Sequence, residues 1–222
     1  MNTEVEKFDK INHDWWNLNS SSVGILHKFN LLRVPYIKKY TNSFDISILD
    51  VGCGGGILAE GLYDVGFSNI IAIDLAQNSI KIATERALHF GKKITYKTID
   101  INDIDEQFDV VICSEVLEHV NNINLMLKAI YDKTKVGGLI FISTINKTIK
   151  SFFETIVAPE YILNIVDKKT HTFNKFVKPS DITNILSKCK ILDIKGVSYS
   201  IIDKNFYFRE DINSNYFIIL QK

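Results

Sequence analysis

Three side chains that could bind a metal ion or accept a proton lie within one short segment, at Glu115, Glu118 and His119. Residues three and four positions apart share one face of a helix. If residues 115–119 are helical, two carboxylates and an imidazole converge, and such a set could hold a divalent cation or supply a general base. The alternative is a solvated turn in which the same side chains make local hydrogen bonds. The spacing alone leaves both interpretations open.

A cluster of glycines follows the apolar run at residues 48–51. Its members are Gly52, Gly54, Gly55 and Gly56. Glycine adopts backbone angles that other residues avoid and lets a ligand approach the main chain closely. The dinucleotide fingerprint Gly-x-Gly-x-x-Gly needs a third glycine where Ile57 stands, so the spacing argues against NAD. The pattern Asp-x-Gly-x-Gly-x-Gly, which starts at Asp50, favours S-adenosylmethionine instead.

Acidic residues follow the apolar runs on either side of this turn. Asp74 ends the second run, about 20 residues after the glycines, where an acid binds ribose hydroxyls in dinucleotide folds. Its alternative role is to cap a helix. Asp50 either organises the amides of the loop or contacts the ligand directly. Asp100 is a candidate for the adenine edge, and Asn102 and Asp103 compete with it for that role.

Short β-rich runs alternate with helical patterns through the middle of the chain. The β-rich runs are residues 47–51, 69–73, 94–99, 109–114 and 139–144, and the helical patterns are residues 57–65, 78–90 and 124–135. This alternation predicts a parallel sheet covered on both faces, with the ligand at the carboxyl ends of the strands. Ser114, at the end of the fourth run, should border the cofactor. Amphipathic helices are expected over residues 4–40, and residues 180–188 should form a helix before strands at 191–197, 206–208 and 216–220.

Composition narrows the class of protein. Lysine and arginine number 26 against 26 aspartate and glutamate residues, so no basic field favours nucleic acid. The three cysteines lack metal-ligand spacing and are expected to be reduced thiols. Residues 1–12 are polar and charged, and no apolar run is long enough to span a bilayer, so neither a signal peptide nor a membrane span is predicted.

Residues 50–56 with Asp74, residues 115–120 and residues 135–144 resemble motifs of the class I S-adenosylmethionine-dependent methyltransferases. The resemblance implies a single α/β domain over residues 1–222. Its fold should be a Rossmann-like, doubly wound and mostly parallel sheet of seven strands with helices on both faces. The expected parts are a helical cap (1–45), a cofactor-binding core (46–146), an apolar insertion (147–179) and a C-terminal helix with strands (180–222).

Further segments resemble the branch of this family that methylates phenolic hydroxyls on polyprenylated precursors of ubiquinone. They are residues 8–16, 31–33, 49–60, 143–146, 158–163 and 170–179. The implied activity is O-methylation of 2-polyprenyl-6-hydroxyphenol and of 3-demethylubiquinol. The resemblance implies cofactor contacts at Arg33, Gly52, Gly54, Asp74 and Ser114. It also implies Mg²⁺ at Glu115, Glu118 and His119.

A phenol of this kind has a pKa of about 10 and is a poor nucleophile until it loses its proton. We expect Mg²⁺ held by Glu115, Glu118 and His119 to stabilise the phenolate. The alternative is that Glu118 or His119 acts as the general base, with His171 as a secondary candidate. A methyltransferase of another small-molecule acceptor, an NAD-dependent oxidoreductase and a non-catalytic adaptor are the rival functions.

The apolar insertion suggests where such an enzyme meets its substrate. Residues 152–166 place apolar pairs at helical spacing around Pro159, and basic residues follow. This makeup suits an element lying in a lipid interface, and a lid or a dimer contact is the alternative. The expected partners are a prenylated phenol and either a membrane surface or other ubiquinone-biosynthesis proteins, with no nucleic acid. The expected location is cytoplasmic, peripheral on the inner face of the membrane.

Overall fold

A computed structural model describes residues 3–9, 11–20, 23–148, 151, 175–200 and 202–222. Most of the predicted apolar insertion and His171 lie outside these described residues. The predictions made for them are therefore not tested by the structure.

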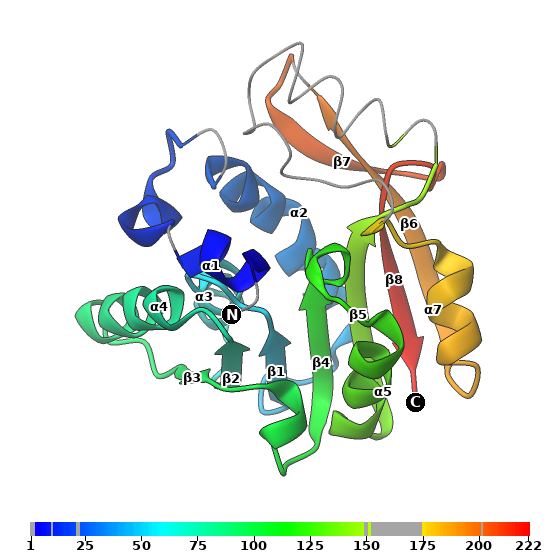
Figure 1. Ribbon diagram of the computed structural model, residues 1–222, viewed down its shortest axis with the longest axis horizontal. Coiled ribbons are helices and arrows are strands. Elements are labelled where there is room, and N and C mark those ends of the chain that lie inside the picture. Colours follow the sequence, from blue (N-terminus) through cyan, green and yellow to red (C-terminus); the bar gives the residue numbers. More distant parts are fainter. Residues whose placement is uncertain (1–2, 10, 21–22, 149–150, 152–174, 201) are drawn as a thin grey trace.

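The centre of the fold is one sheet with the strand order β3-β2-β1-β4-β5-β8-β6-β7 (Figure 1). The first five strands are β1 (Ser47–Val51), β2 (Asn69–Asp74), β3 (Thr95–Thr98), β4 (Phe108–Ser114) and β5 (Thr134–Ile145). They pair in parallel. The antiparallel part consists of β6 (Lys190–Ser200), β7 (Asn205–Arg209) and β8 (Asn215–Gln221). The predicted doubly wound, mostly parallel class is confirmed.

The expected strand number of seven is wrong, because the described residues form a sheet of eight strands. Each of the eight strands corresponds to a run predicted from the sequence, β7 to residues 206–208, and the number seven came from the family resemblance. The short β7 lies at the edge of the sheet and pairs with β6 between Gly196 and Ser200. A second difference lies at β5. It begins at Thr134, where the sequence pattern predicts the end of a helix.

Helices cover both faces of the sheet. They are α1 (Thr3–Asp9), α2 (Gly24–Tyr40), α3 (Ile57–Asp64), α4 (Gln77–His89), α5 (Ile123–Lys133) and α7 (Pro179–Ile185), with 3₁₀ turns η1 (Asn12–Trp16), η2 (Ile101–Asp103) and η3 (Leu117–His119). The helices expected over residues 4–40 are confirmed as α1 and α2. Among the described residues, no helix has both the length and the apolar character needed to cross a bilayer.

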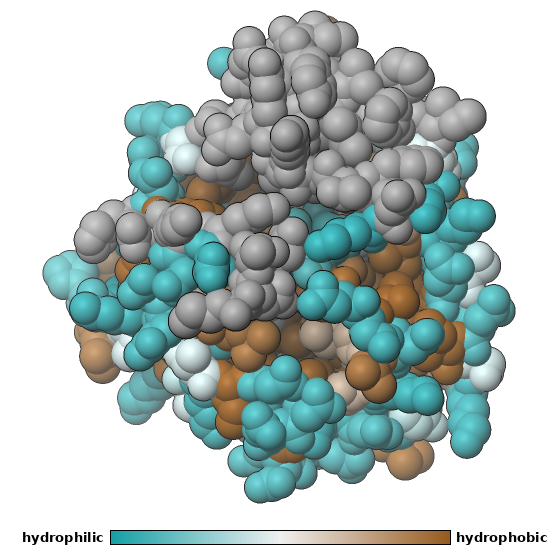
Figure 2. All heavy atoms as spheres, viewed as in Figure 1, coloured by the Kyte–Doolittle hydropathy of each residue, from teal (hydrophilic) through white to brown (hydrophobic). Residues whose placement is uncertain are grey.

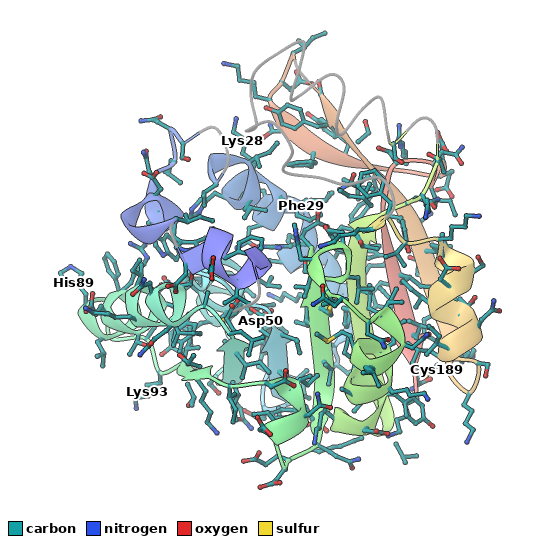
Figure 3. The ribbon with its side chains drawn as sticks, in the orientation of Figure 1. Lys28, Phe29, Asp50, His89, Lys93 and Cys189 are labelled. Atoms are coloured by element: carbon teal, nitrogen blue, oxygen red, sulfur yellow. The ribbon has the colours of Figure 1, made fainter. Side chains whose placement is uncertain are left out.

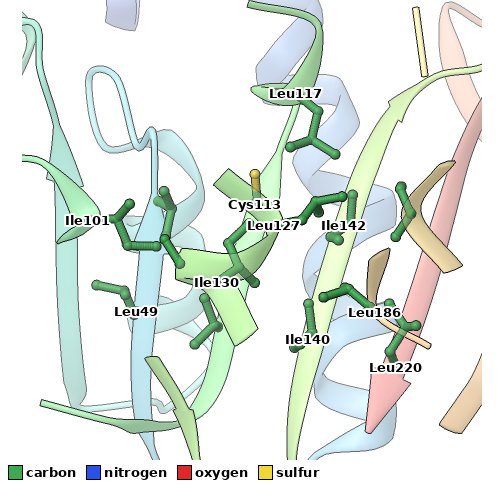
Figure 4. Packing of buried hydrophobic residues seen from close by; sticks show 14 of the residues in the cluster. Leu49, Ile101, Cys113, Leu117, Leu127, Ile130, Ile140, Ile142, Leu186 and Leu220 are labelled. Carbon is green, nitrogen blue, oxygen red and sulfur yellow. The ribbon is translucent and has the colours of Figure 1, made fainter. Parts of the chain in front are cut away.

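Alternate residues of the strands feed two separate cores. Leu49 and Val111 pack with α5 and α7 on one face, as Figure 4 shows for this cluster. Ile48 and Val110 pack with α2 and α3 on the other face. This period of two is what a strand buried on both sides requires. Figure 2 shows polar side chains along the edges of the visible face and apolar ones toward its middle.

Candidate functional site

A cavity of about 370 Å³ opens at the carboxyl ends of the parallel strands. Its walls include the glycine turn after β1, the ends of β2 and β4, η2, and the N-terminal segment that contains α1 and η1. Five of the predicted cofactor-binding residues lie in this wall: Arg33, Gly52, Gly54, Asp74 and Ser114. Figure 3 shows Asp50 near the centre of the molecule, close to α1. The residues predicted to contact the cofactor therefore lie in the wall of one cavity, and their contact with a cofactor stays a prediction.

The glycine turn is closely packed from both sides. Gly52 and Gly54 have φ angles of 71° and 51°, in the left-handed region that side chains rarely adopt. A Cβ atom on Gly52 would lie 2.5 Å from Val116, and one on Gly54 would lie 2.4 Å from the indole of Trp15. The turn therefore has no room for a side chain at Gly52 or Gly54.

Asp74 holds the turn and also faces the cavity. Its carboxylate accepts hydrogen bonds from the amide of Gly54 at 2.8 Å and from the amide of Ala76, the residue before α4, at 2.8 Å. Burial raises the pKa of Asp74, and these amide hydrogen bonds oppose that shift. Because a carboxylate has about four acceptor positions, two remain for a ligand such as a ribose. Asp74 does not cap α4, whose N-cap residue is Ala76 and which has no side-chain cap hydrogen bond, and the ribose role stays a prediction.

Asp50 and Arg33 place opposite charges beside each other in the same cavity. Asp50 is 2% exposed, and its Oδ2 atom makes no hydrogen bond within the described part of the chain. Burial raises the pKa of Asp50 to about 7, although the nearby Arg33 acts in the other direction. Burial also lowers the pKa of Arg33 to about 10, so the guanidinium remains charged at neutral pH. A buried acceptor without a partner and a buried cation suit a ligand that carries both an ammonium and a carboxylate.

A chain of hydrogen bonds links this charge pair to β5. Nη1 of Arg33 donates to Oγ of Ser114 at 3.0 Å, and Nε donates to Asn30 at 2.6 Å. The hydroxyls of Ser114 and Ser143 lie 2.8 Å apart, and Ser143 lies 2.8 Å from Oε1 of Glu115. These bonds fix the orientation of Arg33 without a ligand. Ser114 therefore supports the cofactor wall through a small hydroxyl.

The structure does not place Glu115, Glu118 and His119 on one helical face: Glu115 and His119 line the cavity, whereas Glu118 does not. Glu115 has a φ of 58°, and only one 3₁₀ turn follows it, so the predicted helical face does not exist. Glu118 points away from the cavity, is 4% exposed and accepts a hydrogen bond from Thr144 at 2.7 Å. His119 lines the cavity, and its ring lies 4.9 Å from that of Phe8.

This arrangement does not fit the expected magnesium site. Within the described ranges, no three histidine, cysteine, aspartate or glutamate side chains are placed to hold a metal ion together. Burial raises the pKa of both Glu115 and Glu118, and the charge of Glu115 raises that of Glu118 further. The alternative of a solvated turn is equally wrong, because both carboxyl groups are buried. The segment is a buried turn tied to β5.

The adenine side of the cavity contains only part of the predicted acidic set. Asp100 and Asn102 line it, and Oδ1 of Asp100 accepts from the amide and the side chain of Asn102. Two aromatic residues, Phe8 and Trp15, also line the cavity, and sequence reasoning missed them. The signal available in the sequence was the adjacent pair Trp15 and Trp16 within a family-like segment.

Comparison with known proteins shows the family to which the chain belongs. A family profile described as "Methyltransferase domain" matches residues 28–188. The chain is 42% identical to a ubiquinone biosynthesis O-methyltransferase from Rickettsia bellii, over 99% of this chain and 95% of that one. It is 43% identical to the protein of that name from Rickettsia prowazekii, over 99% and 90%.

Solved structures show the same fold. A magnesium protoporphyrin IX methyltransferase from Synechocystis PCC 6803 with bound SAH has a TM-score of 0.68 at 18% identity, over 91% of this chain and 85% of that one. A methyltransferase from Thermotoga maritima has a TM-score of 0.70 at 13% identity, over 99% of each chain. The chain therefore belongs to the S-adenosylmethionine-dependent methyltransferases and, within them, to the ubiquinone biosynthesis O-methyltransferase family.

Proposed function

We propose that this protein transfers the methyl group of S-adenosylmethionine to phenolic hydroxyls of polyprenylated precursors in ubiquinone biosynthesis. The observation that carries the proposal is one continuous cavity, with the glycine turn and Asp74 on one side and His119 on another. Full-length similarity to enzymes named for this reaction supports the acceptor. The specific acceptors that we propose are 2-polyprenyl-6-hydroxyphenol and 3-demethylubiquinol.

The residues of the cavity fit the cofactor. S-adenosylmethionine supplies an electrophilic methyl group on a sulfonium sulfur. Arg33 would bind the carboxylate of its amino-acid end, and the unpartnered Oδ2 of Asp50 would accept from its ammonium. Asp74 would bind the ribose, and Gly52 and Gly54 allow the backbone to approach. Fixing the donor in this way supplies the orientation on which an in-line displacement depends.

His119 is the residue we favour as the general base. Its ring lines the cavity, whereas Glu118 faces Thr144 and the core. Removal of the phenolic proton contributes about 10²–10⁴ in rate in comparable reactions. His119→Ala should therefore lower kcat by about that factor while the affinity for SAH stays within twofold of wild type. A kcat unchanged by this substitution would contradict the assignment.

The direct test is transfer of a radiolabelled methyl group to a prenylated catechol. The assay should be run with and without lipid, and after treatment with EDTA. Labelled methyl ether is expected from the catechol and none from the doubly methylated analogue. If the catechol remains unlabelled while SAH binds, another small-molecule acceptor replaces the proposed one. The mechanism above does not use magnesium. Full activity after treatment with EDTA would refute the magnesium requirement that the sequence predicted.

The membrane role remains a proposal that rests on sequence alone. The apolar and basic pattern of residues 151–169 suits a lipid interface and would place the protein on the inner face of the membrane. Deleting these residues should abolish sedimentation with anionic liposomes and leave SAH affinity nearly unchanged. Sedimentation of the deletion variant equal to that of the full chain would refute the proposal.

A further inference from the structure

The N-terminal segment covers the cavity from the side opposite the strand ends. Phe8 in α1 and Trp15 in η1 both line it, although neither belongs to the strand–turn–helix core. In Figure 1, α1 lies near the carboxyl ends of β1 and β2, beside α4. The segment therefore forms a wall of the site that the parallel sheet alone does not provide.

One buried hydroxyl ties both aromatic residues to α4. Ser79 is 1% exposed, and its Oγ atom accepts from Nε1 of Trp15 at 3.0 Å and donates to the carbonyl of Phe8 at 3.2 Å. Next to it, Asn78 donates to the carboxylate of Asp9 at 2.7 and 2.9 Å. Buried polar groups of this kind are costly unless their partners stay in place, so Ser79 fixes two points of the segment at once.

The two aromatic residues contact the two functional ends of the site. The indole of Trp15 packs directly on the glycine turn, since a Cβ atom on Gly55 would lie 2.3 Å from its ring. The ring of Phe8 meets that of His119 edge to face, at 4.9 Å and 85°. A single segment thus contacts both the cofactor turn and the candidate base.

We propose that Ser79, Trp15 and Phe8 are positioning residues that link cofactor binding to the placement of His119. Trp15 packs on the glycine turn that would bind the cofactor, and Ser79 fixes the position of Trp15 relative to α1. Phe8 packs against the imidazole of His119. We call the segment closed when the hydrogen bond between Trp15 and Ser79 is formed, and a cofactor bound at the turn beneath Trp15 would favour this arrangement over one in which the bond is broken. The inference rests on the proposed function, since it takes His119 as the base.

The test compares three variants, each of which removes one hydroxyl group or one hydrogen-bond donor. Trp15→Phe keeps an aromatic ring but removes its donor, and Ser79→Ala removes the acceptor. Thr84→Ala is the matched control, because Thr84 lies on the same helix and its hydroxyl bonds only to the carbonyl of Ile80. The measurements are SAH affinity by calorimetry, kcat with saturating donor, and Tm.

Losing one buried hydrogen bond that forms in the closed state should raise the Kd of SAH roughly fivefold to tenfold in Trp15→Phe and in Ser79→Ala. Both should also lower kcat about tenfold at saturating S-adenosylmethionine, while Thr84→Ala changes neither. The double variant should be no worse than Ser79→Ala, because both remove the same bond. A lower Tm with wild-type Kd and kcat would overturn the proposal and leave the segment a structural element only.

A fourth variant separates the acceptor side from the cofactor side. Phe8→Leu should lower kcat about tenfold and leave the Kd of SAH within twofold, and an unchanged kcat would refute the contact with His119.

The chain has two tryptophans, so Trp16→Phe leaves Trp15 as the sole indole and its emission should change when SAH binds. These binding results do not depend on the acceptor. Failure of the proposed acceptor would appear instead as absent methyl transfer by a wild-type protein that binds SAH.

Discussion

Replacing Gly54 with alanine tests whether the glycine turn and Trp15 form the cofactor wall together. Gly54 has a φ of 51°, and a Cβ atom there would lie 2.4 Å from Cη2 of Trp15 and 2.9 Å from Cζ2. The left-handed backbone costs a side-chain-bearing residue about 1–2 kcal/mol. Carbon atoms normally pack about 3.5–4.0 Å apart, so the indole must move by about 1 Å. That movement strains its bond to Ser79, which is worth about 1 kcal/mol.

Gly91 provides the matched control, because its φ is 66° and no atom lies within 4 Å of an added Cβ. Gly91→Ala therefore carries the backbone cost without the steric one. We expect Gly54→Ala to lose about 2–3 kcal/mol and Gly91→Ala about 1–2 kcal/mol, at about 2–4 °C of Tm per kcal/mol.

Binding distinguishes the two variants more sharply than stability does. Gly54 lines the cavity, so the Kd of SAH should rise roughly tenfold or more in Gly54→Ala. It should stay within twofold of wild type in Gly91→Ala. Calorimetric titration measures both. Equal Kd values for the two variants would refute the argument that Trp15 and the turn form one surface.

Two further predictions concern buried charge. Burial raises the pKa of Asp50 to about 7, so the stability that its protonated carboxyl group contributes is present at low pH and is lost as pH rises from about 4 to 7. Asp50→Asn should therefore flatten the fall in Tm of the ligand-free protein between pH 5 and 8. A fall in Tm equal to that of the wild type over this range would contradict the prediction. Glu60 is buried and pairs with Arg86 at 3.2 Å and Lys92 at 2.8 Å, so Glu60→Gln should lower stability by about 3–5 kcal/mol. Glu85→Gln, at an exposed pair, should cost less than about 1 kcal/mol in the same melts.

The strands and the cofactor turn were predictable because their signals are local. Ile48 and Leu49 pack into opposite cores, and Val110 and Val111 do the same, so each strand is visible in the sequence as a continuous apolar run. The glycines within the turn also indicate its position, because a backbone in the left-handed region favours glycine. The short β7 was also predictable, as a strand at residues 206–208, and only the number of strands implied by the family resemblance was wrong.

The segment after β4 was mispredicted because its conformation depends on a distant strand. The amide of Glu115 donates to the carbonyl of Ser143 at 2.9 Å, and its carboxylate accepts from the hydroxyl of the same residue. These two bonds hold Glu115 in a left-handed turn that breaks any helix. Helical spacing describes only residues that are neighbours in sequence, so it could not reveal a partner 28 positions away.

The same limitation explains why the sequence did not single out Trp15 and Phe8 as residues of the site. Trp15 meets its hydrogen-bond partner Ser79 across 64 residues, and Phe8 meets His119 across an even longer stretch of chain. Each of these residues alone looks like an ordinary buried aromatic or hydroxyl. Placed together, they put one segment in contact with the cofactor turn and with the candidate base. A methyltransferase must hold its methyl donor and its general base in a fixed relative position. A shared segment anchored by the buried hydroxyl of Ser79 would achieve this without a further side chain in the cavity. If Ser79→Ala and Phe8→Leu lower kcat independently of each other, the two contacts are separate and this argument fails.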